Sequence, residues 1–110
     1  LQELRGYRVI QGLLEYYKPL LTLSAAEFSG LMEKDRHGTK HLARESRLFN
    51  KLPGKHRKAY EEGLSEHQQK SAAELALWER YYRSRLMQDF ISGMTDQYAL
   101  DEYQSLMVTD

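Results

Sequence analysis

Histidine and cysteine are the residue types that most often hold metal ions, so they set the first limits on chemistry. The chain has four histidines and no cysteine, which excludes disulfides and thiolate metal sites. His37 and His41 stand four residues apart, a spacing that could clamp a metal ion on a helix. Gly38 and Thr39 argue against a helix there, and no third ligand is evident. We therefore interpret both as solvated loop histidines.

The charged residues give no overall preference for one kind of partner. Lys plus Arg number 16 and Asp plus Glu number 16, so the net charge is zero and any binding must be local. Arg80, Arg83 and Arg85 form a basic cluster, but Glu79 and Asp89 interleave with it. We interpret this cluster as a solvated or subunit-facing surface.

Aromatic residues are abundant, with eight tyrosines and a single tryptophan, Trp78. Such side chains can stack on nucleic-acid bases, yet most of them fall on helical stripes, which favours core and interface packing. The longest nearly apolar stretch, Pro19 to Leu23, is far shorter than the roughly 20 residues that span a bilayer, and no signal peptide opens the chain. These observations predict a protein of the cytosol with no membrane partner.

Apolar residues recur at three- and four-residue steps, the spacing that places side chains on one face of a helix, and no strict period-two alternation is present. The fold class is therefore all-α, with about five to six helices in an irregular bundle. The first helix is expected to end before Pro19, and because its pattern is already under way at Leu1 we interpret it as a cut helix. Its predicted apolar face comprises Leu1, Leu4, Tyr7, Ile10, Leu13, Leu14 and Tyr17.

Capping and breaking signals divide the rest of the chain. Ser24 with Glu27 forms a capping-box pattern that predicts a helix over 24–34, followed by an exposed loop over 35–43. Short helices are expected over 44–52 and 55–62, the second stopped by Gly63. A long C-terminal helix should cover 71–107, with a kink or break near 93–95, where Gly93 and Thr95 have low helix propensity.

One segment carries a specific resemblance. The run FISGMTDQYALDEYQSLM, Phe90 to Met107, resembles the C-terminal signature of the bacterial dGTP triphosphohydrolases of the HD superfamily. Upstream pieces are similar to the same family in order: GYRVIQGLLEYYKPL, ESRLFNKLP, HRKAY and LWERYYRSRLMQD. The resemblance implies that 1–110 is a single helical segment from the C-terminal region of such an enzyme, within a cytoplasmic homo-oligomer.

The family resemblance also implies an activity and a division of labour. Its members hydrolyse dGTP to deoxyguanosine and triphosphate with a divalent metal such as Mg²⁺, held by a His-Asp constellation in an N-terminal HD domain. None of the four histidines here is followed by Asp, so we expect no catalytic residue and no metal ligand in this segment. The segment alone should be inactive. Its expected partners are dGTP, the HD domain and further copies, and regulation by single-stranded DNA stays open.

Guanine recognition is the contribution that the resemblance assigns to this segment. The base offers N1–H and N2–H₂ donors that suit a carboxylate, while O6 and N7 are acceptors that suit an arginine. The family's base-recognising Glu corresponds to Glu3 and its guanine-contacting Arg to Arg36. Arg47, in ESRLF, matches a position at the nucleotide site that a neighbouring subunit could supply, although it could equally form a surface ion pair.

An alternative from another class stays open at this stage. The chain could be a freestanding helical module that binds protein or single-stranded nucleic acid through Lys40, Arg44, Arg57 and Lys58. The zero net charge counts against that hypothesis.

Overall fold

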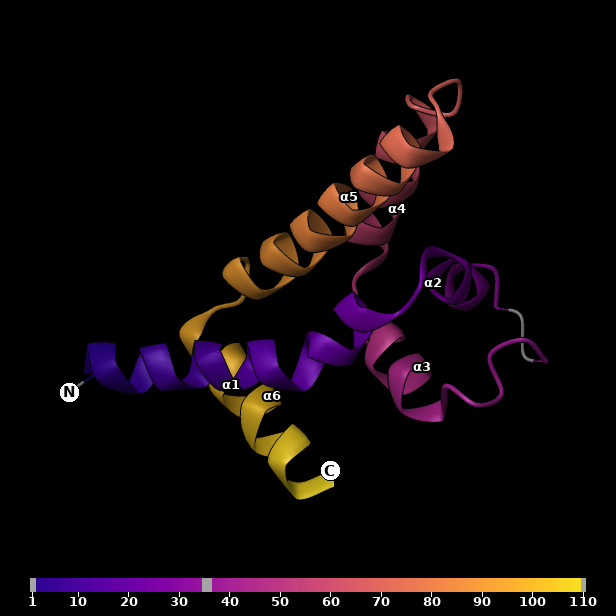
Figure 1. The fold of residues 1–110 in the computed structure, drawn as a ribbon. Helices are drawn as coiled ribbons and strands as arrows, with labels where there is room; N and C mark the ends of the chain where they lie inside the picture. The colour runs from indigo at the N-terminus through magenta and orange to yellow at the C-terminus, as the bar shows by residue number, and fades with distance from the viewer. Residues whose placement is uncertain (1, 35–36, 110) are drawn as a thin grey trace.

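The computed structural model describes the backbone of residues 2–34 and 37–109, and the side chains of 6–34 and 37–108. Over these residues every regular element is a helix (Figure 1). The prediction of an all-α fold with five to six helices is therefore confirmed. The helices are α1 (Gln2–Thr22), α2 (Ala25–Met32), α3 (Ala43–Phe49), α4 (Gly54–Ser65), α5 (Ala72–Ser92) and α6 (Asp96–Thr109).

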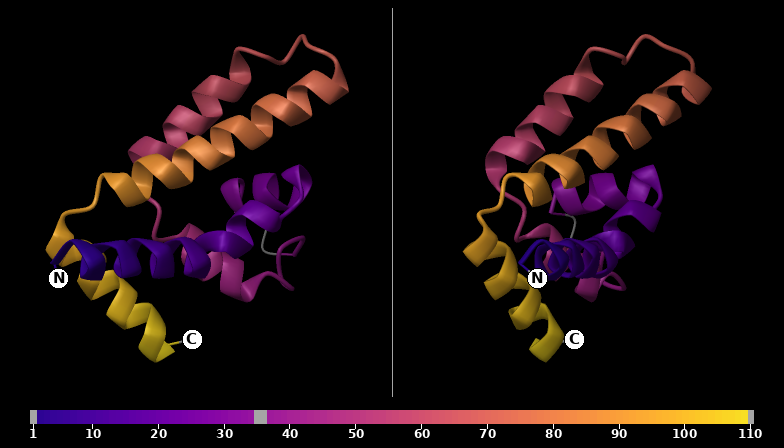
Figure 2. Two further views of the ribbon diagram at one scale, coloured as in Figure 1. Left: turned by 60° about the vertical axis from the view of Figure 1, so that its left-hand side comes forward. Right: turned by 90° about the vertical axis from the view of Figure 1, so that its left-hand side faces the viewer.

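The helices form a base and a projecting hairpin. Helix α1 runs along the base, α6 crosses it, and α2 and α3 lie toward its C-terminal end (Figure 1). Helices α4 and α5 lie side by side and rise from the base as a hairpin, which is clear from both further views (Figure 2). The molecule is accordingly elongated, with extents of 49 × 28 × 21 Å.

One hydrophobic core joins the base to the root of the hairpin. Aromatic rings from different helices meet edge to face at its centre: Phe28 contacts Phe49 and Tyr60, and Tyr17 contacts Phe90, with ring centroids 5.2 to 5.5 Å apart. This is the geometry that aromatic quadrupoles prefer, and it adds a directional term to the burial of apolar surface. The largest fully buried side chains are Tyr17, Phe28, Phe49, Leu13, Leu20, Leu52 and Met87.

Helix α1 corrects the prediction in two respects. First, it continues through Pro19 to Thr22, although Pro19 lacks the N–H that an interior helical position donates. The continuation is stabilised by tertiary contacts, because Leu20 is completely buried and its carbonyl accepts a hydrogen bond from Arg83 Nη1 at 3.3 Å. The lost helical hydrogen bond is thus offset by packing and by a partner from another helix.

The second correction concerns the face of α1 that is buried. Tyr7, Ile10 and Leu14 belong to the predicted apolar face but are exposed, Tyr7 by 62%. Leu13 and Tyr17 of the predicted face are buried, and Val9 and Leu20, which the prediction did not include, are buried with them. Because α1 carries apolar residues on two faces, periodicity alone cannot select the face that meets α3, α5 and α6.

The predicted capping box at Ser24 and the predicted break near 93–95 are both confirmed. Ser24 and Glu27 form the predicted capping box, since Ser24 Oγ accepts from the Glu27 N–H at 3.1 Å and Glu27 Oε1 accepts from the Ser24 N–H at 3.0 Å. The helix predicted over 71–107 consists of two, α5 and α6, and the break between them covers 93–95. Thr95 Oγ1 accepts from the Tyr98 N–H at 3.1 Å at the start of α6.

Helix α4 does not end at Gly63, contrary to the sequence-based expectation. Gly63 lies inside the helix and is buried beneath the ring of Tyr82 on α5, where a Cβ would stand 2.5 Å from Tyr82 Cε1. The absence of a side chain lets α4 and α5 approach closely, so this glycine serves packing rather than termination.

A matched pair of glycines in α1 tests the crossing with α6. A Cβ at Gly12 would lie 2.1 Å from Tyr103 Cε1, and Tyr103 is itself held edge-on against Tyr16 at 5.9 Å. We expect Gly12→Ala to lower the free energy of unfolding by about 1 to 3 kcal/mol through overpacking. Gly6→Ala is the control, because a Cβ there meets nothing within 4 Å.

The control should gain up to about 1 kcal/mol, as alanine is the better helix former. Urea unfolding followed by circular dichroism measures both variants. Equal stability of the two would contradict the close approach of α1 and α6.

Candidate functional site

The predicted guanine-contacting residues are distributed over separate parts of the chain. Glu3 lies within α1, but its side chain is outside the described residues, and Arg36 lies outside them altogether. Arg47 is exposed in the last turn of α3. The start of α1 and the connection between α2 and α3 lie at opposite ends of the molecule (Figure 1). The roles of all three residues stay predictions.

The histidines of the loop after α2 are surface residues, as interpreted from the sequence. His37 is exposed, and His41 Nε2 lies 3.4 Å from Glu27 Oε2. The hydrogen bond from the Ser24 backbone N–H is the main reason why the pKa of Glu27 is lowered, and the Ser24 hydroxyl and His41 add to it. Among the described side chains, those of residues 6–34 and 37–108, no three His, Asp or Glu side chains come together in a group that could hold a metal ion.

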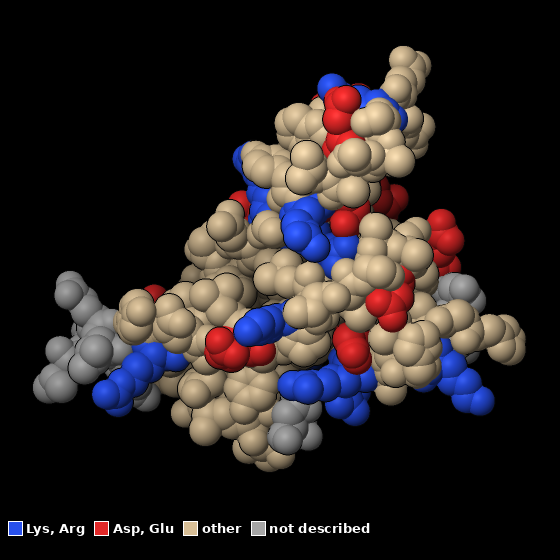
Figure 3. All heavy atoms as spheres, in the orientation of Figure 1, with Lys and Arg blue, Asp and Glu red and all other residues tan. Residues whose placement is uncertain are grey.

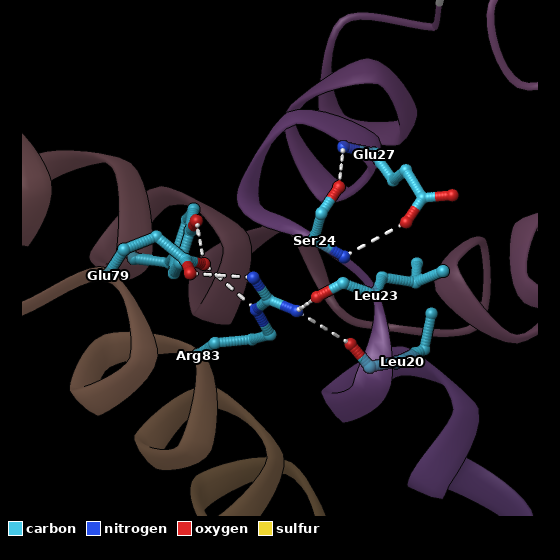
Figure 4. Close-up of polar contacts among 7 residues, drawn as sticks. Leu20, Leu23, Ser24, Glu27, Glu79 and Arg83 are labelled. Carbon is cyan, nitrogen blue, oxygen red and sulfur yellow. Dashed lines mark hydrogen bonds and ion pairs between the residues drawn. The ribbon is translucent and has the colours of Figure 1, made fainter. Parts of the chain in front are cut away.

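A buried ion pair forms the polar centre of the described structure (Figure 4). Arg83 on α5 donates to both carboxylate oxygens of Glu79, from Nε at 2.8 Å and from Nη2 at 2.6 Å. Tyr60 on α4 donates its hydroxyl to Glu79 Oε2 at 2.7 Å. Only 4% of Arg83 is exposed, so these charge-assisted bonds are formed away from water. The hydrogen bond from Tyr60 therefore joins α4 to the ion pair on α5.

The same guanidinium reaches the end of α1. Arg83 Nη1 donates to the carbonyls of Leu20 and Leu23, and its guanidinium carbon lies 4.8 Å from the ring centroid of Phe28 on α2. The donors of Arg83 thus satisfy carbonyls that a helix end leaves without a partner. Burial is the main reason why the pKa of Tyr60 is raised, and Glu79 adds to it, so the hydroxyl keeps its proton and donates.

This centre corrects the interpretation of the basic cluster on α5. The sequence pattern predicts that Glu79 and Arg83 lie on a solvated or subunit-facing surface, but both are buried. Arg80 and Arg85 are exposed, as expected. The missed signal was spacing: 79 and 83 are four residues apart and continue into Leu86 and Phe90, so they share the inward face of α5.

A groove of about 520 Å³ lies between α2, α4 and α5, next to this centre. Tyr60 and Glu79 contribute to its wall, and two further carboxylates, Glu33 and Glu61, line it. Its remaining lining is mostly small or apolar, including Ala25, Met32, Leu64, Ala72, Leu75 and Ala76. Because Arg83 neutralises Glu79, the described lining keeps two carboxylates and no basic residue, so it would repel a triphosphate and does not suit the phosphates of a nucleotide.

A second polar link ties the base together. Glu102 on α6 accepts from the Tyr17 hydroxyl at 3.0 Å and from Lys51 Nζ at 2.9 Å, both at Oε1. Burial raises the pKa of the Tyr17 hydroxyl, and Glu102 raises it further. The link joins α1, α6 and the segment after α3.

Two of the four cations of the alternative nucleic-acid hypothesis have partners within the chain, while Lys40 and Arg44 are exposed. Arg57 is half-buried, with its guanidinium 5.4 Å from the ring centroid of Phe49, and Lys58 lies 3.9 Å from Glu62. On the face shown in Figure 3, Lys and Arg atoms are interspersed with Asp and Glu atoms. Tracking a phosphate backbone requires a continuous basic stripe, and that face presents none.

The aromatic residues of α5 are only partly in the core, and the interface part of the sequence interpretation stays a prediction. Trp78 is half-buried and stacks on His67, with ring centroids 4.0 Å apart, but Tyr81 is 47% exposed. Tyr98 on α6 is exposed as well. A surface of aromatic side chains therefore remains on α5.

The fold and the buried ion pair together define an all-helical domain whose described polar centre is structural. Its amino-acid sequence matches the phosphohydrolase-associated domain family over residues 2–105. The chain belongs to this family, and the match is consistent with an HD-superfamily phosphohydrolase. Over the part of the chain that the structure describes, no helix is both long and apolar enough for a transmembrane span.

The buried ion pair predicts a large effect on stability. Arg83→Met removes the partner of Glu79 and leaves its carboxylate buried, so we expect the free energy of unfolding to fall by about 3 to 5 kcal/mol. Arg80→Met is the matched control, because Arg80 is an exposed cation on the same helix, and its change should stay within about 0.5 kcal/mol.

The double variant Glu79→Leu with Arg83→Met should recover part of the loss, since no unpaired charge then remains. Thermal unfolding of the four proteins decides the matter. An Arg83→Met variant as stable as Arg80→Met would mean that the pair is not buried in solution.

Proposed function

We propose that this chain is the nucleotide-recognition and assembly segment of a dGTP triphosphohydrolase of the HD superfamily. The observation that carries the proposal is the family match over 2–105 combined with the signature-like segment Phe90 to Met107. The parent protein would be a cytoplasmic homo-oligomer that converts dGTP and water to deoxyguanosine and triphosphate.

The place of the signature-like segment in the fold supports this proposal. Its first part forms the junction of α5 and α6: Ile91 is buried, and a Cβ at Gly93 would lie 3.0 Å from the Asp89 carbonyl oxygen. Thr95 then begins α6 through its hydroxyl, and Ala99 is buried against the core. The residues that carry the resemblance therefore set the angle at which α6 crosses α1, which explains why their types matter to this fold.

The chain's own part in the reaction would be binding and positioning. In the proposed enzyme a divalent metal such as Mg²⁺, held by the HD domain, activates the attacking water. The described residues of this chain offer no group that could hold it. Glu3 would accept the N1–H and N2–H₂ donors of guanine, and Arg36 would donate to O6 and N7. Arg47 would contact the nucleotide or a neighbouring subunit.

The fold suggests how many copies such a site needs. Helix α1 has 21 residues and is therefore about 32 Å long. Its start and the connection between α2 and α3 lie at opposite ends of the molecule (Figure 1). A guanine site that draws on both regions would accordingly be assembled from two copies, which fits a homo-oligomer.

The exposed apolar face of α1 supplies a surface for the HD domain. Tyr7, Leu14 and Leu21 are exposed and recur every seven residues, with Ile10 between the first two. This stripe continues along two thirds of the helix, beside the face that is buried in the core. We propose that the HD domain covers it.

Base recognition is tested in the longer protein that contains the HD domain. Arg36→Ala should raise the KM for dGTP by roughly a hundredfold or more, because a buried guanine acceptor would lose its donor, while metal affinity stays unchanged. Lys40→Ala is the control, as Lys40 is an exposed cation in the same connection. Steady-state kinetics with dGTP and dATP measure the effect, and kinetics equal to the parent's would remove Arg36 from the site.

The proposed division of labour has its own test. The purified 110-residue chain should release no triphosphate from dGTP with Mg²⁺ or Mn²⁺ present, whereas the longer protein should. Triphosphate release by the chain alone, measured by ion chromatography, would contradict the proposal.

A further inference from the structure

One face of α5 carries side chains that the fold leaves wholly or partly exposed. Leu77 is 71% exposed, and together with Glu74, Trp78 and Tyr81 it lines a shallow hollow in this surface. The face ends with Arg85, which is also exposed. We call Glu74, Trp78, Tyr81 and Arg85, with Leu77 beside them, the α5 seam.

The aromatic side chains of the seam are held in place within the chain. His67 stacks on Trp78 at a 10° interplanar angle, and Tyr81 packs edge-on against Trp78 and Tyr82 at 5.6 and 5.1 Å. Tyr81 is further fixed by its hydroxyl, which accepts from Arg85 Nη1 at 3.1 Å. Side chains that are already ordered lose little entropy on binding, so the seam is prepared for a partner.

The spacing of the seam is that of a helix pairing surface. Residues 74, 78, 81 and 85 follow one another at steps of four, three and four, the alternation that repeats along a coiled-coil contact. The seam covers twelve residues, 74–85, and its two ends are about 16 Å apart along the helix. This spacing therefore favours another helix as the partner that packs on the seam.

The charges of the seam identify that helix. Glu74 stands at one end and Arg85 at the other, with Trp78 and Tyr81 between them. When a second copy is laid antiparallel across the midpoint between 79 and 80, Trp78 faces Tyr81 of the other copy and Glu74 faces its Arg85. The exposed polar residues Ser71 and Gln88 face each other in the same register. The surface is self-complementary, as a two-fold interface requires.

We propose that two copies of this chain associate through the α5 seam as an antiparallel, two-fold pair. Trp78 and Tyr81 of the two copies would pack at the centre of the interface. At each end, Glu74 of one copy would form an ion pair with Arg85 of the other. Arg85 has five N–H donors, so it can keep its bond to Tyr81 and still donate to Glu74 of the other copy. Asp89, 3.7 Å from Arg85, is the competing carboxylate within the chain.

Charge reversal tests the register. Sedimentation velocity of the 110-residue chain, over roughly a hundredfold range of concentration, should show a reversible dimer. Glu74→Arg and Arg85→Glu should each weaken dimerisation at least about tenfold, because like charges then face each other across the pair. Combining the two substitutions should restore it, since the ion pairs are re-formed with opposite polarity.

The controls separate pairing from folding. Arg80→Glu reverses an exposed cation on the same helix outside the seam and should leave dimerisation unchanged. Far-ultraviolet circular dichroism checks the helix content of every variant. Trp78 is the only tryptophan, so its emission should shift to shorter wavelength with dimerisation in the parent and the double variant.

Three results would overturn the proposal. A chain that stays monomeric throughout would leave the seam to a different partner, such as the HD domain. A dimer that is insensitive to both single reversals would use another surface, and a double variant no better than the single ones would exclude this register. None of these measurements involves dGTP. The pairing can therefore be disproved without affecting the proposed function, and the proposed function can be disproved without affecting the pairing.

Discussion

The position of the hairpin relative to the base depends on one buried guanidinium. Arg83 would be costly to bury alone, and its burial is tolerated because Glu79 neutralises it and two main-chain carbonyls accept hydrogen bonds from its Nη1 atom. These partners belong to α5 itself and to the C-terminal end of α1, while Tyr60 brings in α4 through Glu79. Hydrophobic contacts are nondirectional, so they could accept several angles between hairpin and base. The planar fork of donors on an arginine is compatible with only a few of these angles, so the Arg83 contacts fix a single arrangement of hairpin and base.

The same contact explains the local structure at the end of α1. Carbonyls left over at the C-terminus of a helix need donors, and Pro19 has already removed one donor from this stretch. Arg83 supplies donors to Leu20 and Leu23, after which Ser24 can leave the helical conformation and begin α2 with its capping box. The turn between α1 and α2 is therefore held from both sides, by a side chain from α5 and by a local cap. Because α2 lines the groove between α2, α4 and α5, this turn also places one wall of that groove.

Local signals in the sequence predicted the elements, whereas the choices between faces required the whole fold. The capping box at Ser24 and the break at 93–95 depend on residues within one turn, so spacing alone revealed them. The burial of Arg83 and the exposure of Tyr7 depend on which helices meet, and no pattern within α1 or α5 determines that. For the nucleotide site the sequence went no further than a family correspondence for Glu3, Arg36 and Arg47, because partners that lie far apart along the chain, or in another copy, leave no local pattern.

The chain carries more apolar helix surface than its own core uses. The large hydrophobic side chains that are exposed in the described part fall mainly on three helices, Tyr7, Ile10, Leu14 and Leu21 on α1, Leu77 and Tyr81 on α5, and Tyr98, Met107 and Val108 on α6. In α1 they recur along a face beside the buried one, and in α5 the two of them lie across the helix from the buried face, so both helices carry apolar surface beyond the side that the core covers. Single hydrophobic side chains scattered over a surface need no explanation. Exposed hydrophobic side chains on neighbouring turns of one helix lower solubility unless a partner covers them. A division of these surfaces between a catalytic domain on α1 and a second copy on α5 would use both, and it would place the hairpin between the two copies.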